Sequence, residues 1–309
     1  MDKKQLGNTD MDITRIGFGA WAIGGGNWEF GWGPQDDEKA IAAIKRAVER
    51  GMNWIDTAAV YGLGHSEVLV SKAVKGMNKQ PFIFTKCGLR WDDSGKIQRL
   101  TKAASIRQEC EDSLRRLDVE VIDLYQIHWP VDDDIEEAWE MMAQLQMEGK
   151  VRYIGVSNFD AEQIKRCQTI APVASLQPPY SLIKRDYEKE TLPYCKNENV
   201  GVIVYSPMGS GMLTGAMTRK RIENMPENDW RKKHQWFQEP ELTKNLELAD
   251  KLKSIGEKHG YSAGEVAIAW TLRNPAVTAA IVGARSAEQV DGIYRAAECQ
   301  LDKEDLEQI

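Results

Sequence analysis

The sequence has few residues of the kinds that form disulfides, bind metals or attract polyanions. Its 309 residues include five cysteines and four histidines. The cysteines are odd in number, far apart and free of any C-x-x-C pair, so we expect no disulfide framework, no metal site and a reducing compartment. Lys and Arg (40) are fewer than Asp and Glu (47), giving a net charge of −7. Such a surface does not favour the phosphates of nucleic acid.

Long apolar runs are also lacking. No run approaches the ~20 residues of a membrane helix, and residues 1–5 lack the apolar core of a signal peptide. We therefore expect a cytoplasmic protein without a membrane partner. The composition, 42% hydrophobic and 28% charged, is typical of globular proteins and excludes disorder. The length suits one large domain over residues 1–309, which we expect to be a monomer whose partner is a small molecule.

Short β-branched or aromatic runs alternate with longer segments of helical period, a pattern typical of βα units and a parallel sheet. The expected strands are 15–19, 53–56, 82–86, 122–128, 151–157, 174–177, 201–205 and 279–283. The expected helices are 39–50, 66–74, 101–117, 135–148, 161–167, 187–198 and 287–297, with two more near 242–259 and 262–273. This order predicts an α/β fold: a (β/α)₈ TIM barrel with an N-terminal β-hairpin and extra helices before the last strand.

An open doubly wound sheet is the rival fold. It predicts a G-x-G-x-x-G turn that follows the first strand and opens a helix. Here Gly17 and Gly19 are followed by Ala20, Trp21 and Ala22, so that fingerprint is absent and the barrel is favoured.

Polar residues close six successive expected strands. In such barrels the active site is built at the carboxyl ends of the strands, so these side chains should converge on one face. They are Asp56, Lys86, His128, Ser157 with Asn158, Gln177, and Tyr205 with Ser206.

Four residues of this face suit proton transfer to a carbonyl oxygen: Asp56, Tyr61, Lys86 and His128. A free phenol has a pKa of about 10 and is a poor acid–base group at neutrality. A nearby ammonium favours phenolate and lowers that pKa, while a carboxylate keeps the ammonium charged. An imidazole N–H can hold the oxygen on which charge develops.

Motifs along nearly the whole chain, from about residue 6 to 297, resemble the aldo-keto reductase family, in the order the family has them. They are Ile55-Asp56-Thr57-Ala58 with Tyr61-Gly62, Ser66-Glu67, Lys86, Asp123-Leu124-Tyr125-Gln126-Ile127-His128-Trp129, Gly155-Val156-Ser157-Asn158-Phe159 and Tyr205-Ser206-Pro207. The run from Trp21 to Gly25 is most similar to a bacterial subgroup with broad carbonyl substrates.

The resemblance implies a (β/α)₈ barrel that uses NADP(H) to reduce aldehydes or ketones. It implies Tyr61 as proton donor, Lys86 and Asp56 as the groups that tune it, and His128 as the group that orients the carbonyl. The cofactor residues implied by the match are Ser157, Asn158 and Gln177 for the carboxamide, Tyr205 for the nicotinamide ring, and Ser206, Gly209 and Leu213 for the pyrophosphate loop. The match around the adenine end includes Gly283 and Gln289.

Tryptophan is frequent, with ten residues, and several fall in expected βα loops above the barrel. We expect Trp21 to face both cofactor and substrate, and Trp91 and Trp129 to line the substrate pocket. The sequence departs from many relatives at Ser210, where an Arg is common, and at Gly292 and Ile293, where Glu-Asn often stands.

Arg285 predicts the choice of coenzyme. It follows the last expected strand, just before a helix, where barrels commonly form a phosphate site. A guanidinium matches the ribose 2′-phosphate of NADP(H) with two parallel hydrogen bonds. The alternative is that Arg285 only caps the barrel rim.

Two other functions fit the sequence. Some members of the resembled family serve as accessory subunits of potassium channels and turn over slowly, which would make the chain a cofactor-sensing subunit. That reading expects a long N-terminal extension, whereas the expected first hairpin begins near Lys4. A Schiff-base aldolase barrel would instead use Lys86 as nucleophile, which requires a lysine of lowered pKa.

Overall fold

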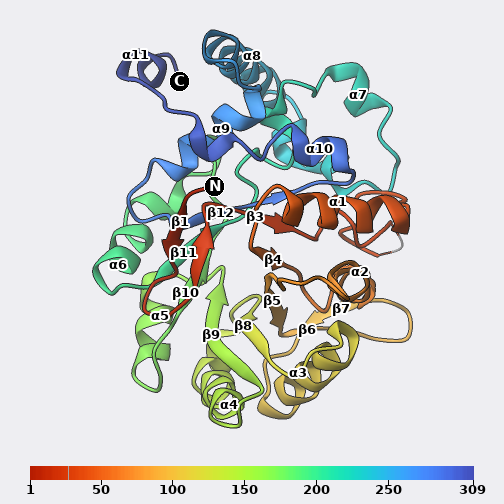
Figure 1. Ribbon diagram of the computed structural model, residues 1–309, viewed down its shortest axis with the longest axis vertical. Coiled ribbons are helices and arrows are strands. Elements are labelled where there is room, and N and C mark those ends of the chain that lie inside the picture. The colour runs from red at the N-terminus through yellow and green to blue at the C-terminus, as the bar shows by residue number, and fades with distance from the viewer. Residues whose placement is uncertain (27) are drawn as a thin grey trace.

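The computed structural model describes residues 1–26 and 28–309, and a closed barrel of parallel strands forms its centre (Figure 1). Each strand pairs with the next barrel strand along the chain, and the last pairs back to the first. The eight strands are β3 (Ile16–Gly19), β4 (Trp54–Asp56), β5 (Phe82–Cys87), β8 (Ile122–Ile127), β9 (Val151–Ser157), β10 (Ser175–Gln177), β11 (Gly201–Val204) and β12 (Ala279–Gly283). The predicted (β/α)₈ TIM barrel and its strands are confirmed.

Helices surround the barrel, and every barrel strand except β11 is followed along the chain by one helix of the set below (Figure 1). They are α1 (Asp37–Glu49), α2 (His65–Val74), α3 (Ala103–Leu117), α4 (Ile135–Met147), α5 (Ala161–Gln168), α6 (Thr191–Asn197) and α10 (Ala287–Asp291). Their limits follow from local chemistry: Asp36 accepts the backbone N–H of Lys39 at the start of α1 (2.8 Å), and Asp160 forms a capping box with Gln163 at the start of α5.

The floor of the barrel is apolar and is closed by the N-terminal hairpin of β1 (Lys3–Gln5) and β2 (Asp12–Thr14). Gly17 is glycine because the Trp54 ring fills this space: a Cβ there would lie 2.0 Å from the ring. The floor cluster contains Leu6, Met11, Ile13, Trp54, Phe84, Leu124, Ala174, Ile203, Ala279 and Ile281.

A polar layer stands above this floor because strand side chains alternate. Two residues beyond Trp54, Phe84 and Leu124 come Asp56, Lys86 and Gln126, all of them at most 2% exposed. The inward positions thus change from apolar to polar toward the carboxyl ends of the strands, which places the buried ionisable groups directly beneath the barrel mouth.

Two expected helices are shorter in the structure. Instead of one helix over 187–198, a 3₁₀ turn at Asp186–Glu188 precedes α6, because Pro193 lacks a backbone N–H and fits only the first turn of a helix. The segment 287–297 divides after α10, where Gly292 takes the C-cap position, and a separate 3₁₀ turn follows at Ala296–Glu298.

The structure adds elements that the sequence did not predict. A two-stranded extension, β6 (Leu89–Trp91) and β7 (Ile97–Arg99), follows β5. Short helices α7 (Arg219–Glu223) and α11 (Lys303–Gln308) were also missed, whereas the extra helices α8 (Glu241–His259) and α9 (Ala263–Leu272) were expected. Within the described part of the chain, no helix is long and apolar enough to cross a membrane.

Candidate active site

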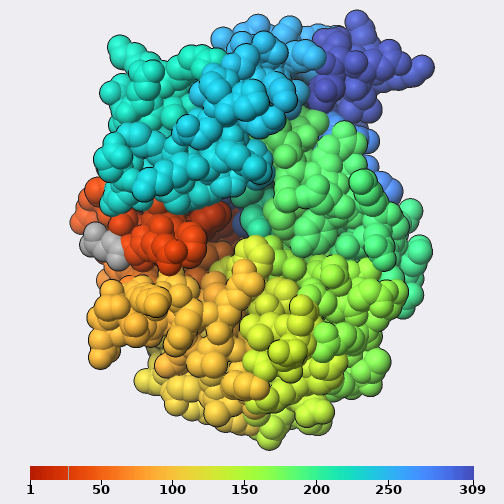
Figure 2. Space-filling model, turned by 180° about the vertical axis from the view of Figure 1, so that it is seen from behind, coloured from red at the N-terminus to blue at the C-terminus, as the bar shows by residue number. Residues whose placement is uncertain are grey.

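A cavity of about 760 Å³ opens at the carboxyl ends of the barrel strands, a volume in the range of small-molecule sites. Figure 2 shows this face, with a hollow where the N-terminal, yellow-green and cyan segments meet. The walls come from the loops after β3, β5 and β11, and the base from the strand ends. The predicted convergence of polar strand ends on one face is confirmed in geometry.

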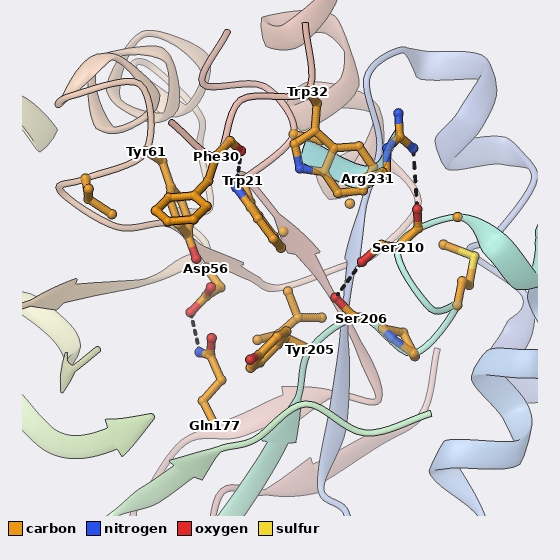
Figure 3. A pocket seen from close by; sticks show the side chains of 18 of the residues that line it. Trp21, Phe30, Trp32, Asp56, Tyr61, Gln177, Tyr205, Ser206, Ser210 and Arg231 are labelled. Atoms are coloured by element: carbon orange, nitrogen blue, oxygen red, sulfur yellow. Dashed lines mark hydrogen bonds between the residues drawn. The ribbon is translucent and has the colours of Figure 1, made fainter. Parts of the chain in front are cut away.

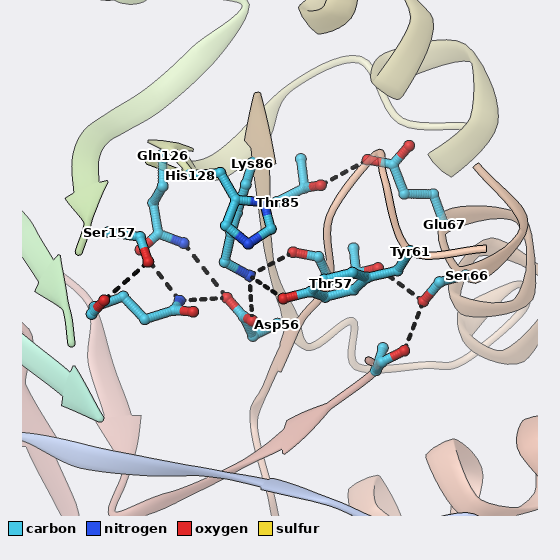
Figure 4. Close-up of polar contacts among 12 residues, drawn as sticks. Asp56, Thr57, Tyr61, Ser66, Glu67, Thr85, Lys86, Gln126, His128 and Ser157 are labelled. Carbon is cyan, nitrogen blue, oxygen red and sulfur yellow. Dashed lines mark hydrogen bonds and ion pairs between the residues drawn. The ribbon is translucent and has the colours of Figure 1, made fainter. Parts of the chain in front are cut away.

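Asp56, Tyr61 and Lys86 form one buried hydrogen-bonded group (Figure 4). The Lys86 ammonium donates to Asp56 Oδ1 (2.5 Å), to the Thr57 carbonyl (2.8 Å) and to the Tyr61 hydroxyl (3.4 Å). The His128 ring stands nearly perpendicular to the Tyr61 ring, with centroids 5.6 Å apart. Asp56, Tyr61 and His128 line the cavity, and Lys86 lies behind them.

The net electrostatic effect on Tyr61 differs from the expectation. Burial, with Asp56 and Tyr205, raises the pKa of the Tyr61 phenol well above its ordinary value. The expected lowering by Lys86 is outweighed because a phenolate in this cavity loses its hydration. The phenol therefore keeps its proton at neutral pH.

The cationic groups are also shifted by burial. Burial lowers the pKa of Lys86, and Asp56 and Glu67 oppose that shift. Burial, together with Lys86 and Arg99, lowers the pKa of His128 well below its ordinary value. His128 is thus a neutral imidazole at neutral pH, with one N–H to donate.

A chain of amides and hydroxyls lines the cavity beside this group. The Tyr205 hydroxyl donates to Asn158 Oδ1 (2.9 Å), and Asn158 Nδ2 donates to Ser157 Oγ (3.1 Å) and to the His128 carbonyl (2.9 Å). Ser157 Oγ donates to the Gln177 carbonyl (2.9 Å), and Gln177 Nε2 to Asp56 Oδ2 (2.8 Å). The predicted residues Ser157, Asn158, Gln177 and Tyr205 therefore form one connected network.

The loop after β11 supplies small polar residues and a guanidinium (Figure 3). Ser206 and Ser210 line the cavity, their hydroxyls 3.5 Å apart. Gly209 and Leu213 are not among the described residues that line it: Gly209 packs against Ile183, and Leu213 is buried in a core cluster beside the barrel.

The predicted phosphate residue Arg285 lines the cavity together with Gly283 and Gln289. Its guanidinium donates to Gln35 Oε1 (2.6 Å) and to the carbonyls of Trp32 (3.1 Å) and Pro34. Gln289 Oε1 accepts the backbone N–H of Arg285 (2.8 Å). Arg285 thus connects the strand β12 end to the loop after β3.

Aromatic side chains form the outer wall. Trp21 stacks on Trp230 with ring centroids 5.5 Å apart and lies 6.2 Å from Tyr61. Trp21 and Trp129 line the cavity as expected. Trp91 does not appear among its described lining residues and packs instead beside Leu89 and Ile97.

Sequence reasoning missed several lining residues. Arg99 lies over the Trp129 ring (4.7 Å), and Arg231 over the Trp32 ring (4.3 Å), paired with Asp229 (2.6 Å). Arg231 also donates to the Ser210 carbonyl (3.4 Å), which brings a guanidinium next to Ser210. Their loops show no periodic pattern that would have located them.

The aldo/keto reductase family model matches residues 15–309. The chain belongs to the aldo/keto reductase family. This confirms the resemblance, and the protein is therefore an oxidoreductase of the class that acts on carbonyl substrates with a nicotinamide cofactor.

Relatives and solved structures cover nearly the entire chain. Aldo-keto reductase YhdN of Bacillus subtilis is 36% identical over 313 residues, covering 100% of this chain and 92% of that protein. The NADH-specific methylglyoxal reductase of Escherichia coli is 34% identical, covering 94% and 91%.

Among structures, the glycerol dehydrogenase AKR11B4 of Gluconobacter oxydans superposes with a TM-score of 0.90 at 38% identity, covering 99% of this chain and 93% of that chain. An aldo-keto reductase from Klebsiella pneumoniae in complex with NADPH superposes with a TM-score of 0.76 at 25% identity, covering 100% and 94%. These relatives differ in coenzyme, so family membership alone does not fix the coenzyme of this chain.

Proposed function

We propose that this reductase converts aldehydes or ketones to alcohols with NADP(H), and that Tyr61 is the proton donor. The observation that carries the proposal is the position of the Tyr61 hydroxyl, which stands at the base of the cavity between Lys86 and His128. A carbonyl oxygen placed there meets an O–H donor, an N–H donor and a buried cation, the groups that stabilise developing negative charge.

The cavity lining has the chemistry to hold a dinucleotide. Amide groups of Asn158 and Gln177 suit a carboxamide, and the Tyr205 ring suits stacking on a flat ring. Ser206 and Ser210 with Arg231 offer hydroxyl and guanidinium donors for a pyrophosphate. When bound, the dinucleotide supplies a hydride to the carbonyl carbon.

The chain's own residues perform the proton transfer. Tyr61 releases its phenolic proton to the substrate oxygen as charge develops there, and the Lys86 ammonium stabilises the phenolate that remains. Asp56 holds Lys86 charged against the effect of burial. The neutral His128 donates an N–H to the same substrate oxygen and fixes its position. The aromatic wall of Trp21 and Trp129 excludes water.

The choice of NADP(H) over NAD(H) rests on Arg285, which lines the cavity at the end of β12. Arg285 and Arg231 both line the cavity, and they are close enough that Arg231 contributes to a lowered pKa of Arg285, after burial. Because Arg231 is paired with Asp229 (2.6 Å), Arg285 is the guanidinium that favours a cofactor with an additional phosphate. The NADH-specific relative from E. coli makes this a property to be tested on the chain itself.

An NADPH-oxidation screen over aldehydes, ketones and sugars tests the proposal, with NADH as the parallel arm. We expect turnover of at least one carbonyl class, faster with NADPH. Tight NADPH binding without turnover of any compound would favour the cofactor-sensing accessory subunit. The lowered pKa of Lys86 meets one requirement of a Schiff-base aldolase. Lys86 is nevertheless paired with Asp56 and is not among the described residues that line the cavity, so we expect borohydride to trap no adduct.

A further inference from the structure

Gln126 is a buried polar residue that the proposed mechanism does not use. It lies on β8 between Leu124 of the apolar floor and His128 of the cavity base, and it is 0% exposed. The interior layers of such barrels are filled mainly by bulky apolar side chains. A buried amide costs free energy unless it is hydrogen-bonded, so its partners indicate what it does.

Both ends of the Gln126 amide contact residues of the cavity (Figure 4). Its Nε2 donates to Asp56 Oδ2 (3.4 Å), and its Oε1 accepts from Gln177 Nε2 (3.3 Å). Gln177 Nε2 also donates to Asp56 Oδ2 (2.8 Å). The three side chains close a triangle in which Gln126 alone does not line the cavity.

The triangle fixes the orientation of the Gln177 amide. A glutamine NH₂ group has two hydrogens, and here one is directed to Asp56 and the other to Gln126. Reversing the amide would point the Gln177 oxygen at the Asp56 carboxylate and at the Gln126 oxygen, a repulsive arrangement. The Gln177 oxygen is therefore left as an acceptor for a group in the cavity.

Gln126 packs against the neighbouring strand β9 at Gly155. Gly155 on the neighbouring strand β9 has no side chain, and a Cβ there would lie 3.4 Å from Gln126 Cγ and 2.4 Å from Ser175 Oγ. The close approach of Ser175 is what requires a glycine here, and Gln126 packs at ordinary contact distance beside it.

We propose that Gln126 is a positioning residue for the nicotinamide end of the cofactor: it holds the Gln177 amide with its oxygen toward the cavity, where it accepts the carboxamide N–H. The inference rests on the proposed use of a nicotinamide cofactor at this site. Gln126 touches neither cofactor nor substrate and acts only through Gln177 and Asp56.

The decisive variant is Gln126→Met, which keeps the length of the side chain and removes both hydrogen-bonding groups. We expect NADP⁺ to bind about 3–10-fold more weakly, the effect of one lost orienting hydrogen bond, in a titration followed by tryptophan fluorescence. Adenosine 2′,5′-bisphosphate, which lacks the nicotinamide, should bind the variant and the parent equally. In kinetics, KM for NADPH should rise more than kcat falls.

Tyr125→Phe is the matched control. Tyr125 is the neighbour of Gln126 on β8, and its side chain is on the opposite face of the strand. Its buried hydroxyl makes no hydrogen bond to Asp56 or Gln177. This variant should bind NADP⁺ as the parent does, which separates the amide's role from a general disturbance of β8.

Gln126→Glu adds a measurement, the pH dependence of NADP⁺ binding, that should not change if Gln126 only fills space. A protonated carboxyl group can donate to Asp56 and accept from Gln177, as the native amide does. Beside Asp56 the pKa of the introduced carboxyl should be raised, so NADP⁺ binding to this variant should recover as pH falls from about 8 to about 6. The parent should show no such recovery.

The outcomes are distinguishable. If the parent protein binds no NADP⁺, the proposed function fails. If the parent binds NADP⁺ and Gln126→Met binds it equally well, Gln126 has no positioning role. The inference is also overturned if the variant binds adenosine 2′,5′-bisphosphate more weakly than the parent by the same factor as NADP⁺.

Discussion

The Tyr61 hydroxyl is the group on which the proposed chemistry most directly depends. We expect Tyr61→Phe to lower carbonyl reduction by about 10²–10⁴-fold, the usual contribution of a positioned general acid. NADPH binding should be nearly unchanged, because the ring that contacts Trp21 and His128 is retained. A spectrophotometric assay and a fluorescence titration measure the two effects. Turnover within a few-fold of the parent would remove Tyr61 from the mechanism.

Lys86 supplies the positive charge next to that phenol. In Lys86→Met this charge is lost, so the pKa of Tyr61, which burial already raises, should rise further. Alcohol oxidation needs the phenolate as base, and its pH optimum should therefore move to higher pH as the rate falls. A pH–rate profile checks this, with circular dichroism as the control for folding. An unchanged profile in a merely slower enzyme would mean that Lys86 is structural.

Arg285 decides the coenzyme in our proposal. Arg285→Ala should weaken NADPH binding by about 1.5–3 kcal/mol, as for a hydrogen bond to a charged group, and leave NADH nearly unchanged. The guanidinium also holds the loop at Trp32 and Gln35, and loosening that loop would affect both cofactors. Titration of each cofactor separates the two roles, since equal losses would contradict the phosphate assignment.

At the scale of elements, Glu109 of α3 anchors the extension β6–β7 beside the cavity. Its carboxyl accepts the backbone N–H of Gly88 (3.0 Å), at the junction of β5 and β6, and the hydroxyl of Ser105 (3.1 Å). Burial raises the pKa of Glu109 to about 7. The folded state therefore binds this proton more tightly than the unfolded chain, in which the pKa of glutamate is about 4.3.

Stability should consequently fall as pH rises from about 4.3 to about 7. At higher pH the loss of stability should stay constant at about 4 kcal/mol by linkage. Glu109→Gln removes the ionisation. We expect this variant to be more stable than the parent toward urea above neutral pH and similar to it near pH 5, a difference that urea unfolding at several pH values will measure. An equal difference at every pH would show that Glu109 does not titrate in this window.

The strands and the polar strand ends were predictable because both follow from short-range rules. A barrel strand is an apolar run, and the alternation of its side chains sends every second residue inward, so Asp56, Lys86 and His128 could be assigned to the mouth from sequence alone. Gln126 obeys the same alternation two residues before His128, and its position within an apolar strand was an available signal that was not used.

The loops were less predictable because their conformations depend on contacts made after the barrel forms. Arg231 reaches Trp32 and Ser210 across long sequence separations, and nothing in its neighbours specifies those partners. The direction of the Tyr61 pKa shift was predicted wrongly for the same reason. The sequence indicates which charged residues lie near the phenol, but the extent to which folding removes water from the phenolate depends on the folded structure.

At the scale of the whole molecule, we propose that residues 1–309 form one domain and one monomer. The large hydrophobic residues exposed in the described structure are Met1, Phe30, Val121 and Met147, too few for an interface core. Light scattering should therefore give the mass of a single chain, and thermal unfolding should show a single transition. A dimer mass at micromolar concentration, or two separated transitions, would contradict this proposal.

The proton-transfer residues lie on or next to the barrel strands, whereas much of the cavity wall lies on loops, so the two parts should differ in how well they tolerate mutation. Asp56, Lys86 and Gln126 are fixed to a barrel whose floor is packed around Trp54, so most substitutions there should cost stability and activity together. The walls at Trp129 and on the extension β6–β7 lie on separate segments that surround the mouth. Directed evolution of substrate range should therefore gather its accepted mutations in those segments, with the proton-transfer group inherited unchanged.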